Sequence, residues 1–140
     1  MALLIDVMSF RKVFVLLILF VSLTACAGKH PKLWVSSKVV DFGEIPRFPV
    51  IHTSTLEITN KGKDILYIED VRSSCTCVYS KPSKRIIHRG DKVSLHIELN
   101  TKLSNYGPFE QKVALYTNTN ESPTYIKIIG VVIKNNENSK

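Results

Sequence analysis

Hydrophobic and polar residues alternate along much of the chain after residue 32, and this alternation predicts β-strands. The clearest run is Val93–Leu99, in which every second residue is apolar. Successive side chains of a strand point to opposite faces, so this pattern is typical of a strand with one buried face. Thr53–Thr59 and Phe109–Thr117 alternate in the same way, and the expected inward side chains of the latter are Phe109, Val113 and Leu115.

Turn-forming residues separate these runs from one another. Asn60–Lys63 predicts a turn, because Asn and Gly tolerate positive φ, and Lys81–Lys84 with Pro82 predicts a loop. About seven short strands with turns between them predict an all-β, immunoglobulin-like antiparallel β-sandwich over residues 38–133. The other expected extended segments are Leu33–Val35 with Lys38–Phe42, Ile65–Val71 (dense enough in apolar residues to be buried on both faces), Arg85–Ile87 and Tyr125–Ile133.

Composition agrees with one folded domain and gives no sign of catalysis. Of the 140 residues, 44% are hydrophobic, which is enough for a core without a metal or cofactor. The net charge of +7 could suit nucleic acid, but the cationic cluster Lys81–Arg85 has only Tyr79 nearby, so we expect a solvated loop and no nucleic-acid partner. We find no glycine-rich phosphate loop and no catalytic triad, and we expect neither an enzyme nor a cofactor.

The first 23 residues have the layout of a secretory signal. Arg11-Lys12 forms a basic region, and the apolar run Val13–Leu23 follows it. A transmembrane anchor is the alternative, but about 11 residues are too few to span roughly 30 Å of hydrocarbon as a helix. We expect Met8 to be the true initiator, because Met1–Val7 adds an unusual stretch before the basic pair.

Leu23-Thr24-Ala25-Cys26 resembles the bacterial lipobox. The resemblance implies that residues 1–25 are a lipoprotein signal peptide, cleaved before Cys26, and that the Cys26 thiol carries a diacylglyceryl group with palmitate. A chance cysteine is the alternative. Residues 26–37 would then be the lipid anchor and tether. Ala27 is not the Asp that retains lipoproteins in the inner membrane, so we expect an outer-membrane protein that faces the periplasm.

Cys75 and Cys77 are the remaining unusual chemistry. On a strand, residues at i and i+2 share a face with Cα atoms about 6.5–7 Å apart, the upper limit for a disulfide. Three hypotheses stay open: packed thiols or a structural bridge, a redox-active pair, and a metal site completed by His88 or His96. In an oxidising compartment we expect the two cysteines to bridge each other.

Seven short motifs follow one another over residues 38–133. They are Phe42-Gly43, Asn60-Lys61-Gly62, Cys75-Thr76-Cys77, Gly90-Asp91, Gly107-Pro108-Phe109, Asn118 and Gly130-Val131-Val132. Their order and spacing resemble the bacterial domain of unknown function 1573. The resemblance implies an immunoglobulin-like sandwich of the Hydin and abnormal-spindle type, frequent in secreted proteins and lipoproteins of the Bacteroidetes, with no established activity. Two positions depart from the family: Thr76 replaces the Gly of a Cys-Gly-Cys signature, and Arg89 replaces a Pro. Thr resists the positive φ that Gly adopts easily.

Together these patterns predict a lipid-anchored module of the bacterial cell envelope. We expect it to bind another protein or envelope component through its end loops and sheet edges. Trp34 and Tyr106 are candidate contact residues, and packing in the core or in a loop is the equal alternative for both. Residues 134–140 are polar and are expected to be a disordered tail. The alternative is a thiol-redox or metal-handling protein that acts through Cys75 and Cys77.

Overall fold

The computed structural model describes residues 29–135, which form nine β-strands and one short 3₁₀ helix. The expected signal peptide, Cys26 and most of the expected tail lie outside the described residues. The elements are β1 (Leu33–Val35), β2 (Val39–Pro46), β3 (Ile51–Asn60), β4 (Leu66–Ser73), β5 (Val78–Pro82), β6 (Ile86–Ile87), β7 (Lys92–Asn100), η1 (Thr101–Leu103), β8 (Gly107–Thr117) and β9 (Thr124–Ile133).

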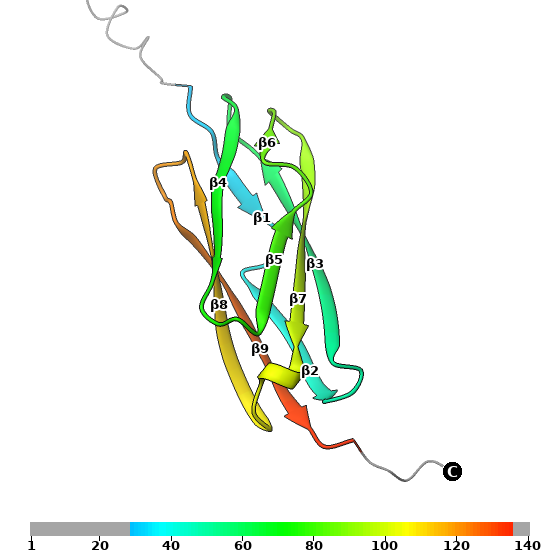
Figure 1. Ribbon diagram of the computed structural model, residues 1–140. Helices are drawn as coiled ribbons and strands as arrows, with labels where there is room; N and C mark the ends of the chain where they lie inside the picture. Colours follow the sequence, from blue (N-terminus) through cyan, green and yellow to red (C-terminus); the bar gives the residue numbers. More distant parts are fainter. Residues whose placement is uncertain (1–28, 136–140) are drawn as a thin grey trace, which may run out of the picture.

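The strands form two sheets that pack face to face (Figure 1). One sheet has the order β1-β3-β7-β5, and the other has the order β2-β9-β8-β4-β6. The immunoglobulin-like sandwich predicted from the alternation is therefore confirmed. Strand structure begins at Leu33, inside the stretch expected to be a tether. Among residues 29–135, no helix has the length and apolar character needed to cross a membrane.

The first extended segment is divided between the two sheets. β1 pairs antiparallel with β3, and β2 pairs parallel with β9. The other strand pairs of the described residues are antiparallel, as predicted. The β2–β9 register shifts between Asp41 and Glu44, where Gly43 has φ +63° and donates its N–H to Asp41 Oδ1 at 2.8 Å. Gly adopts this φ without strain, so it permits the bulge.

The alternating residues fill the space between the sheets. Leu95, Ile97 and Leu99 of β7 are fully buried, and Val93 is almost so. On the facing sheet, Val113 and Leu115 of β8 are fully buried, as predicted. Each such side chain contributes about 1.5–3 kcal/mol of hydrophobic stabilisation.

One end of the sandwich, which we name the Asn60 end, is built around the buried side chain of Asn60. Its amide nitrogen donates to the carbonyls of Asp64 and Ile87, at 2.7 and 2.9 Å, and its oxygen accepts from the N–H groups of Gly62 and Lys32, at 2.9 and 3.3 Å. Gly62 lies under residues 30–32, where a Cβ would stand 2.3 Å from the Lys32 nitrogen. One side chain therefore joins the incoming chain to two turns.

Two local predictions were wrong, and the turn at Asn60 was placed correctly but forms for another reason. Residues 81 and 82, predicted as loop, belong to β5, because pairing with β7 overrides the low strand propensity of Lys and Pro. The segment Ile65–Val71 is buried on one face only, since Tyr67 and Glu69 of β4 point outward. Asn60 forms its turn without positive φ, because its buried side chain makes the turn contacts.

Candidate functional site

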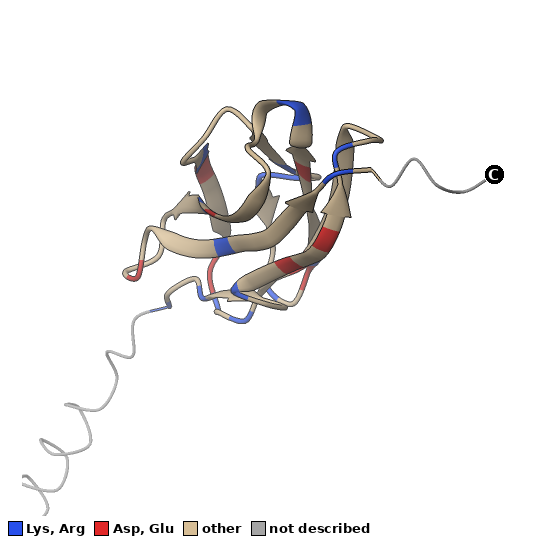
Figure 2. Cartoon of the chain, turned by 90° about the horizontal axis from the view of Figure 1, so that it is seen from below, with Lys and Arg blue, Asp and Glu red and all other residues tan. Residues whose placement is uncertain are grey.

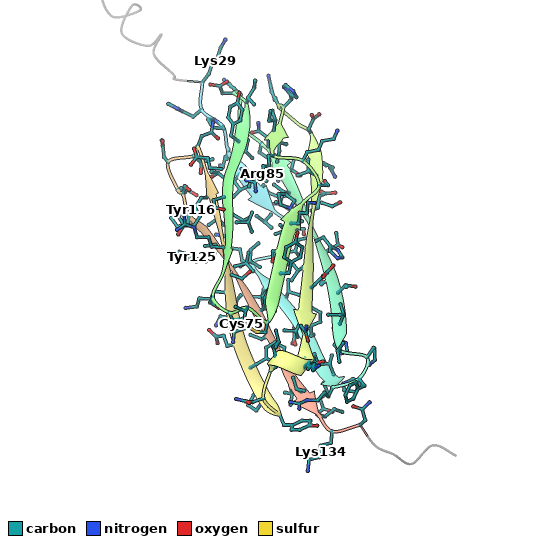
Figure 3. All side chains as sticks on the ribbon, in the orientation of Figure 1. Lys29, Cys75, Arg85, Tyr116, Tyr125 and Lys134 are labelled. Carbon is teal, nitrogen blue, oxygen red and sulfur yellow. A yellow bond between two sulfur atoms is a disulfide. The ribbon has the colours of Figure 1, made fainter. Side chains whose placement is uncertain are left out.

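Cys75 and Cys77 lie in the turn between β4 and β5 rather than on a strand (Figure 3). Their Cα atoms are 5.2 Å apart, closer than the 6.5–7 Å expected for a strand, because the turn contracts the backbone. The sulfur atoms are joined as a disulfide. Among the described residues no non-glycine residue has positive φ, so the turn accommodates Thr76 without the conformation that Thr resists.

The turn is held on both sides by main-chain hydrogen bonds. Val78 N–H donates to the Cys75 carbonyl at 3.3 Å, and Asn100 N–H donates to the Cys77 carbonyl at 2.8 Å. The side chain of Cys77 packs in the core at 5% exposure, and Cys75 is half-buried against it. Burial agrees with a structural role for the pair, while the redox and metal hypotheses stay predictions.

The histidines proposed as further ligands lie elsewhere. His96 Nε2 contacts Glu98 Oε1 at 3.1 Å, and His96 pairs with Lys81 in the register of β5 and β7. That position is three residues, about 10 Å, from Val78, which follows Cys77. His88 lies in the turn before β7. Within residues 29–135, no three His, Cys, Asp or Glu side chains are grouped so that they could hold a metal ion.

A groove of about 510 Å³ opens beside the cysteine turn. The turn between β4 and β5 forms one wall, η1 with the following loop forms the other, and the first half of β8 forms the floor. Figure 1 shows the turn beside the lower half of β8 and above η1. The lining residues are Cys75, Thr76, Cys77, Leu103, Ser104, Asn105, Pro108, Phe109, Glu110 and Gln111.

Large hydrophobic side chains are exposed at the end of the sandwich farthest from Lys29. We name it the Phe48 end; it comprises residues 47–51, residues 101–106 and the last residue of β9. Phe48 and Leu103 are 60% and 59% exposed, which is unusual for such side chains. Figure 3 labels Lys29 and Lys134 near opposite ends of the molecule. The exposed hydrophobic residues here are Phe48, Ile51, Leu103, Tyr106 and Ile133.

The loops of the Phe48 end are fixed by specific contacts. The guanidinium of Arg47 lies 3.9 Å from the centre of the Tyr106 ring and donates to the Ser104 carbonyl at 2.6 Å. The hydroxyl of buried Thr101 donates to the Arg47 carbonyl at 2.7 Å, and Asn135 exchanges two hydrogen bonds with the main chain of Phe48. The exposed apolar surface is therefore held in one arrangement before any partner binds.

Sequence patterns identified only part of this end. Tyr106 was a candidate for contact or for loop packing, whereas Phe48 and Leu103 were missed because they lie outside any alternating run. Trp34, the other expected contact residue, lies on β1, where Lys61 Nζ is 4.3 Å from its ring centre. Acidic and basic residues are interspersed over both sheets (Figure 2).

Comparison with known proteins identifies the family. The model of the family described as a protein of unknown function, DUF1573, matches residues 33–132. The chain belongs to the DUF1573 family. The DUF1573 match covers both sheets and the cysteine turn. No curated protein matches the sequence.

Solved structures similar to this DUF1573 chain share its fold at low sequence identity. A protein of unknown function from Porphyromonas gingivalis W83 aligns with TM-score 0.67 and 17% identity, over 77% of this chain and 50% of its own. The chain thus spans half the length of that relative. The ASH/PapD-like domain 7 of human CEP192 aligns with TM-score 0.60 and 12% identity, over 81% and 93%. The periplasmic chaperone SfaE aligns with TM-score 0.51 and 10% identity, over 75% and 59%.

Proposed function

We propose that this protein is a lipid-anchored, periplasm-facing binding module that presents the Phe48 end to another protein of the bacterial envelope. Its DUF1573 sandwich fits a binding or structural module. The observation that carries the proposal is the position of the exposed Phe48 and Leu103, at the end opposite Lys29. Exposed apolar side chains that gather on one surface mark interaction sites.

The motif Leu23–Cys26 supports the anchoring half of the proposal. A diacyl group on Cys26 would hold the chain firmly, because each buried CH₂ contributes about 0.8 kcal/mol. Only a short segment separates Cys26 from β1, so the Asn60 end would face the bilayer and the Phe48 end would face away from it. The rigid loops lower the entropic cost of ordering on binding.

Site-specific photo-crosslinking in native membranes tests the binding half. A photo-reactive residue placed at Phe48 or at Leu103 should give the same protein adduct, because both side chains lie at the proposed contact. The matched control places the photo-reactive residue at Tyr125, which is 57% exposed on β9, and it should not give this adduct. Equal adducts from all three positions would show random collision and overturn the proposal.

The anchor is tested separately by Cys26→Ala. This change removes the sulfur to which the lipid would attach, so metabolic labelling with a fatty acid should disappear and the uncleaved chain should accumulate. Mature protein that still carries the label would contradict lipidation at Cys26.

The crosslinking positions also need a control for folding. Phe48→Ser and Leu103→Ser should each change the free energy of unfolding by under about 0.5 kcal/mol, because both side chains are exposed.

A further inference from the structure

The first half of β8 has an unpaired edge. β8 pairs with β9 from Gly107 to Leu115, but β4 covers β8 only from Val113 to Thr117. The chain leaves β8 at Ser74 and forms the cysteine turn instead. Residues 108–111 therefore have β9 on one side and line the groove on the other, and the Ser74 hydroxyl donates to Gln111 Oε1 at the upper limit of this stretch, at 2.8 Å.

The direction of each main-chain group on this edge follows from three hydrogen bonds. Lys112 N–H donates to Ser74 Oγ at 2.9 Å, and Ser74 N–H donates to the Lys112 carbonyl at 2.8 Å. Lys127, which lies opposite Lys112, donates its N–H to the Lys38 carbonyl on β2 at 2.8 Å. Lys112 and Lys127 are therefore a pair that exchanges no ladder bonds.

Because ladder bonding alternates with period two, Glu110 has the same orientation as Lys112. Its N–H and its carbonyl both point away from β9, toward the groove, and so does the carbonyl of Pro108. These groups can pair with another main chain. The β8–β9 register is continuous from residue 107 to residue 115, so no bulge reverses this alternation.

Parts of two other strand edges lack free main-chain groups. Arg85 donates to the carbonyls of Ile68 and Glu69 on β4, at 3.3 and 2.8 Å, and β6 covers Leu66 and Tyr67. β5 ends at Pro82, which has no N–H. The β8 edge differs. Among the hydrogen bonds of the described residues, no side chain bonds to the main-chain N–H or carbonyl of Glu110, whose carboxylate instead accepts from Lys127.

We propose that this groove binds an extended peptide segment of a partner protein, which adds to β8 as a short strand in line with β4. The floor from Pro108 to Gln111 is about 13 Å long, enough for a strand of about four residues. The cysteine turn and the loop after η1 line the groove beside this edge, and this enclosure favours a single extended segment over the edge of a second sandwich.

The groove also fixes the side-chain chemistry of the peptide. The peptide residue opposite Glu110 points its side chain outward, and its two neighbours point inward, toward Phe109, Leu103 and the disulfide. Apolar residues at those two positions match these surfaces. The inference rests on the proposed function, because it names the chemistry of a partner that binds beside the Phe48 end.

The test uses the full, processed chain in lipid nanodiscs, with a displayed library of random heptapeptides as the first probe and empty nanodiscs as the blank. Selected peptides should carry apolar residues two positions apart. The strongest, made synthetically, should slow hydrogen exchange at the Glu110 amide, while the Phe109 and Gln111 amides are already protected by β9. The same peptide with N-methyl groups at alternate residues should lose at least tenfold in affinity. Failure to enrich any peptide, or binding that leaves the Glu110 amide unchanged, overturns the proposal.

Variants of the protein provide the second arm. Glu110→Pro removes the edge N–H without removing a bond to β9, and should weaken binding at least about tenfold. Glu110→Ala retains the N–H and is the matched control, and its affinity for the peptide should stay within about threefold of that of the unaltered chain. Asn105→Trp fills the groove from the opposite wall and should block the peptide even if Glu110→Pro does not fold. Equal binding by Asn105→Trp and the unaltered chain would contradict the site.

The two proposals fail in different ways. If crosslinks from Phe48 and Leu103 persist while no peptide binds the groove, the binding module stands and the added strand is wrong. If a peptide binds the groove but the crosslinks in membranes do not depend on position, the groove stands and the proposed role of the Phe48 end is wrong.

Discussion

The two ends of this sandwich use their loops in opposite ways. At the Asn60 end, a fully buried amide makes four hydrogen bonds within the chain. At the Phe48 end, hydrogen bonds and the Arg47–Tyr106 contact fix the loops, but the large apolar side chains face solvent. The comparison shows that rigid loops have two uses here: one set satisfies its own polar groups, and the other presents apolar surface.

The largest expected difference in stability is between variants of two asparagines, one at each end of the sandwich. Asn60→Ala should lower the free energy of unfolding by about 3–5 kcal/mol, because it leaves buried donors and acceptors unpaired. Asn135→Ala removes two hydrogen bonds to Phe48, but these are exposed to water, and should cost under about 1 kcal/mol. Urea unfolding measures both. Similar costs would end the distinction between the ends.

The core between the two ends gives a reference for these changes in the free energy of unfolding. Leu95→Ala should cost about 2–5 kcal/mol, because Leu95 is fully buried in β7. Lys92→Ala, on an exposed position of the same strand, loses only its 3.0 Å contact with Glu57 and should cost under about 0.5 kcal/mol. If calorimetry gives both variants the same melting midpoint, the assignment of the inward face is wrong.

The cysteine turn should give a smaller effect. Replacing both Cys75 and Cys77 by Ser should lower stability by about 1–3 kcal/mol, mainly because one hydroxyl becomes buried at Cys77. The ring closed by the bridge contains one intervening residue, so loop-closure entropy adds little. Thiol trapping with mass measurement, with and without reductant, tests the bridge itself. Two free thiols in protein taken from native cells without reductant would contradict the disulfide.

The smallest expected effect is a change of stability with pH, which comes from Asp70 on β4. Arg72 Nε donates to Asp70 Oδ2 at 2.7 Å, and this bond, with one from the Val71 N–H, lowers the pKa of Asp70. Because the pKa of Asp70 is lower in the folded state than in the unfolded chain, its charged carboxyl stabilises the fold at pH values above the unfolded pKa of about 3.9. That contribution is lost as the pH falls through the folded pKa. NMR titration should show the Asp70 pKa below the ordinary value, and Arg72→Ala should raise it. An unchanged pKa in Arg72→Ala would exclude this cause.

Local patterns predicted most of the fold because each strand needs only its own alternation to be recognised. Val93–Leu99 and Phe109–Thr117 became β7 and β8 with the expected residues inside. β5 was missed because its strand character comes from pairing with β7. The turn at Asn60 was placed correctly but for the wrong reason, since the residue acts through its side chain and not through positive φ.

The candidate site was predictable only in part. Cys75 and Cys77 stand out in the sequence by residue type, and they form one wall of the groove. The unpaired edge of Glu110 depends on where β4 ends relative to β8, which is a property of register between distant segments. Phe48 and Leu103 lie far apart in the chain, and only the tertiary fold brings them to one end.

The division of the first extended segment between two sheets has a mechanical consequence. β1 is bonded to β3 and β2 to β9, so a pull on the chain before Leu33 acts first on the β1–β3 bonds and passes along the chain through β2 to the second layer. β1 and β2 lie along the long axis of the molecule (Figure 1), and a load along that axis shears whole rows of hydrogen bonds together instead of opening them singly. Resistance to such a load is set by the rate of forced unfolding rather than by equilibrium stability. A domain held at one end and gripped at the other would therefore meet tension with two successive barriers, the β1–β3 bonds of one layer and then the β2–β9 bonds of the other.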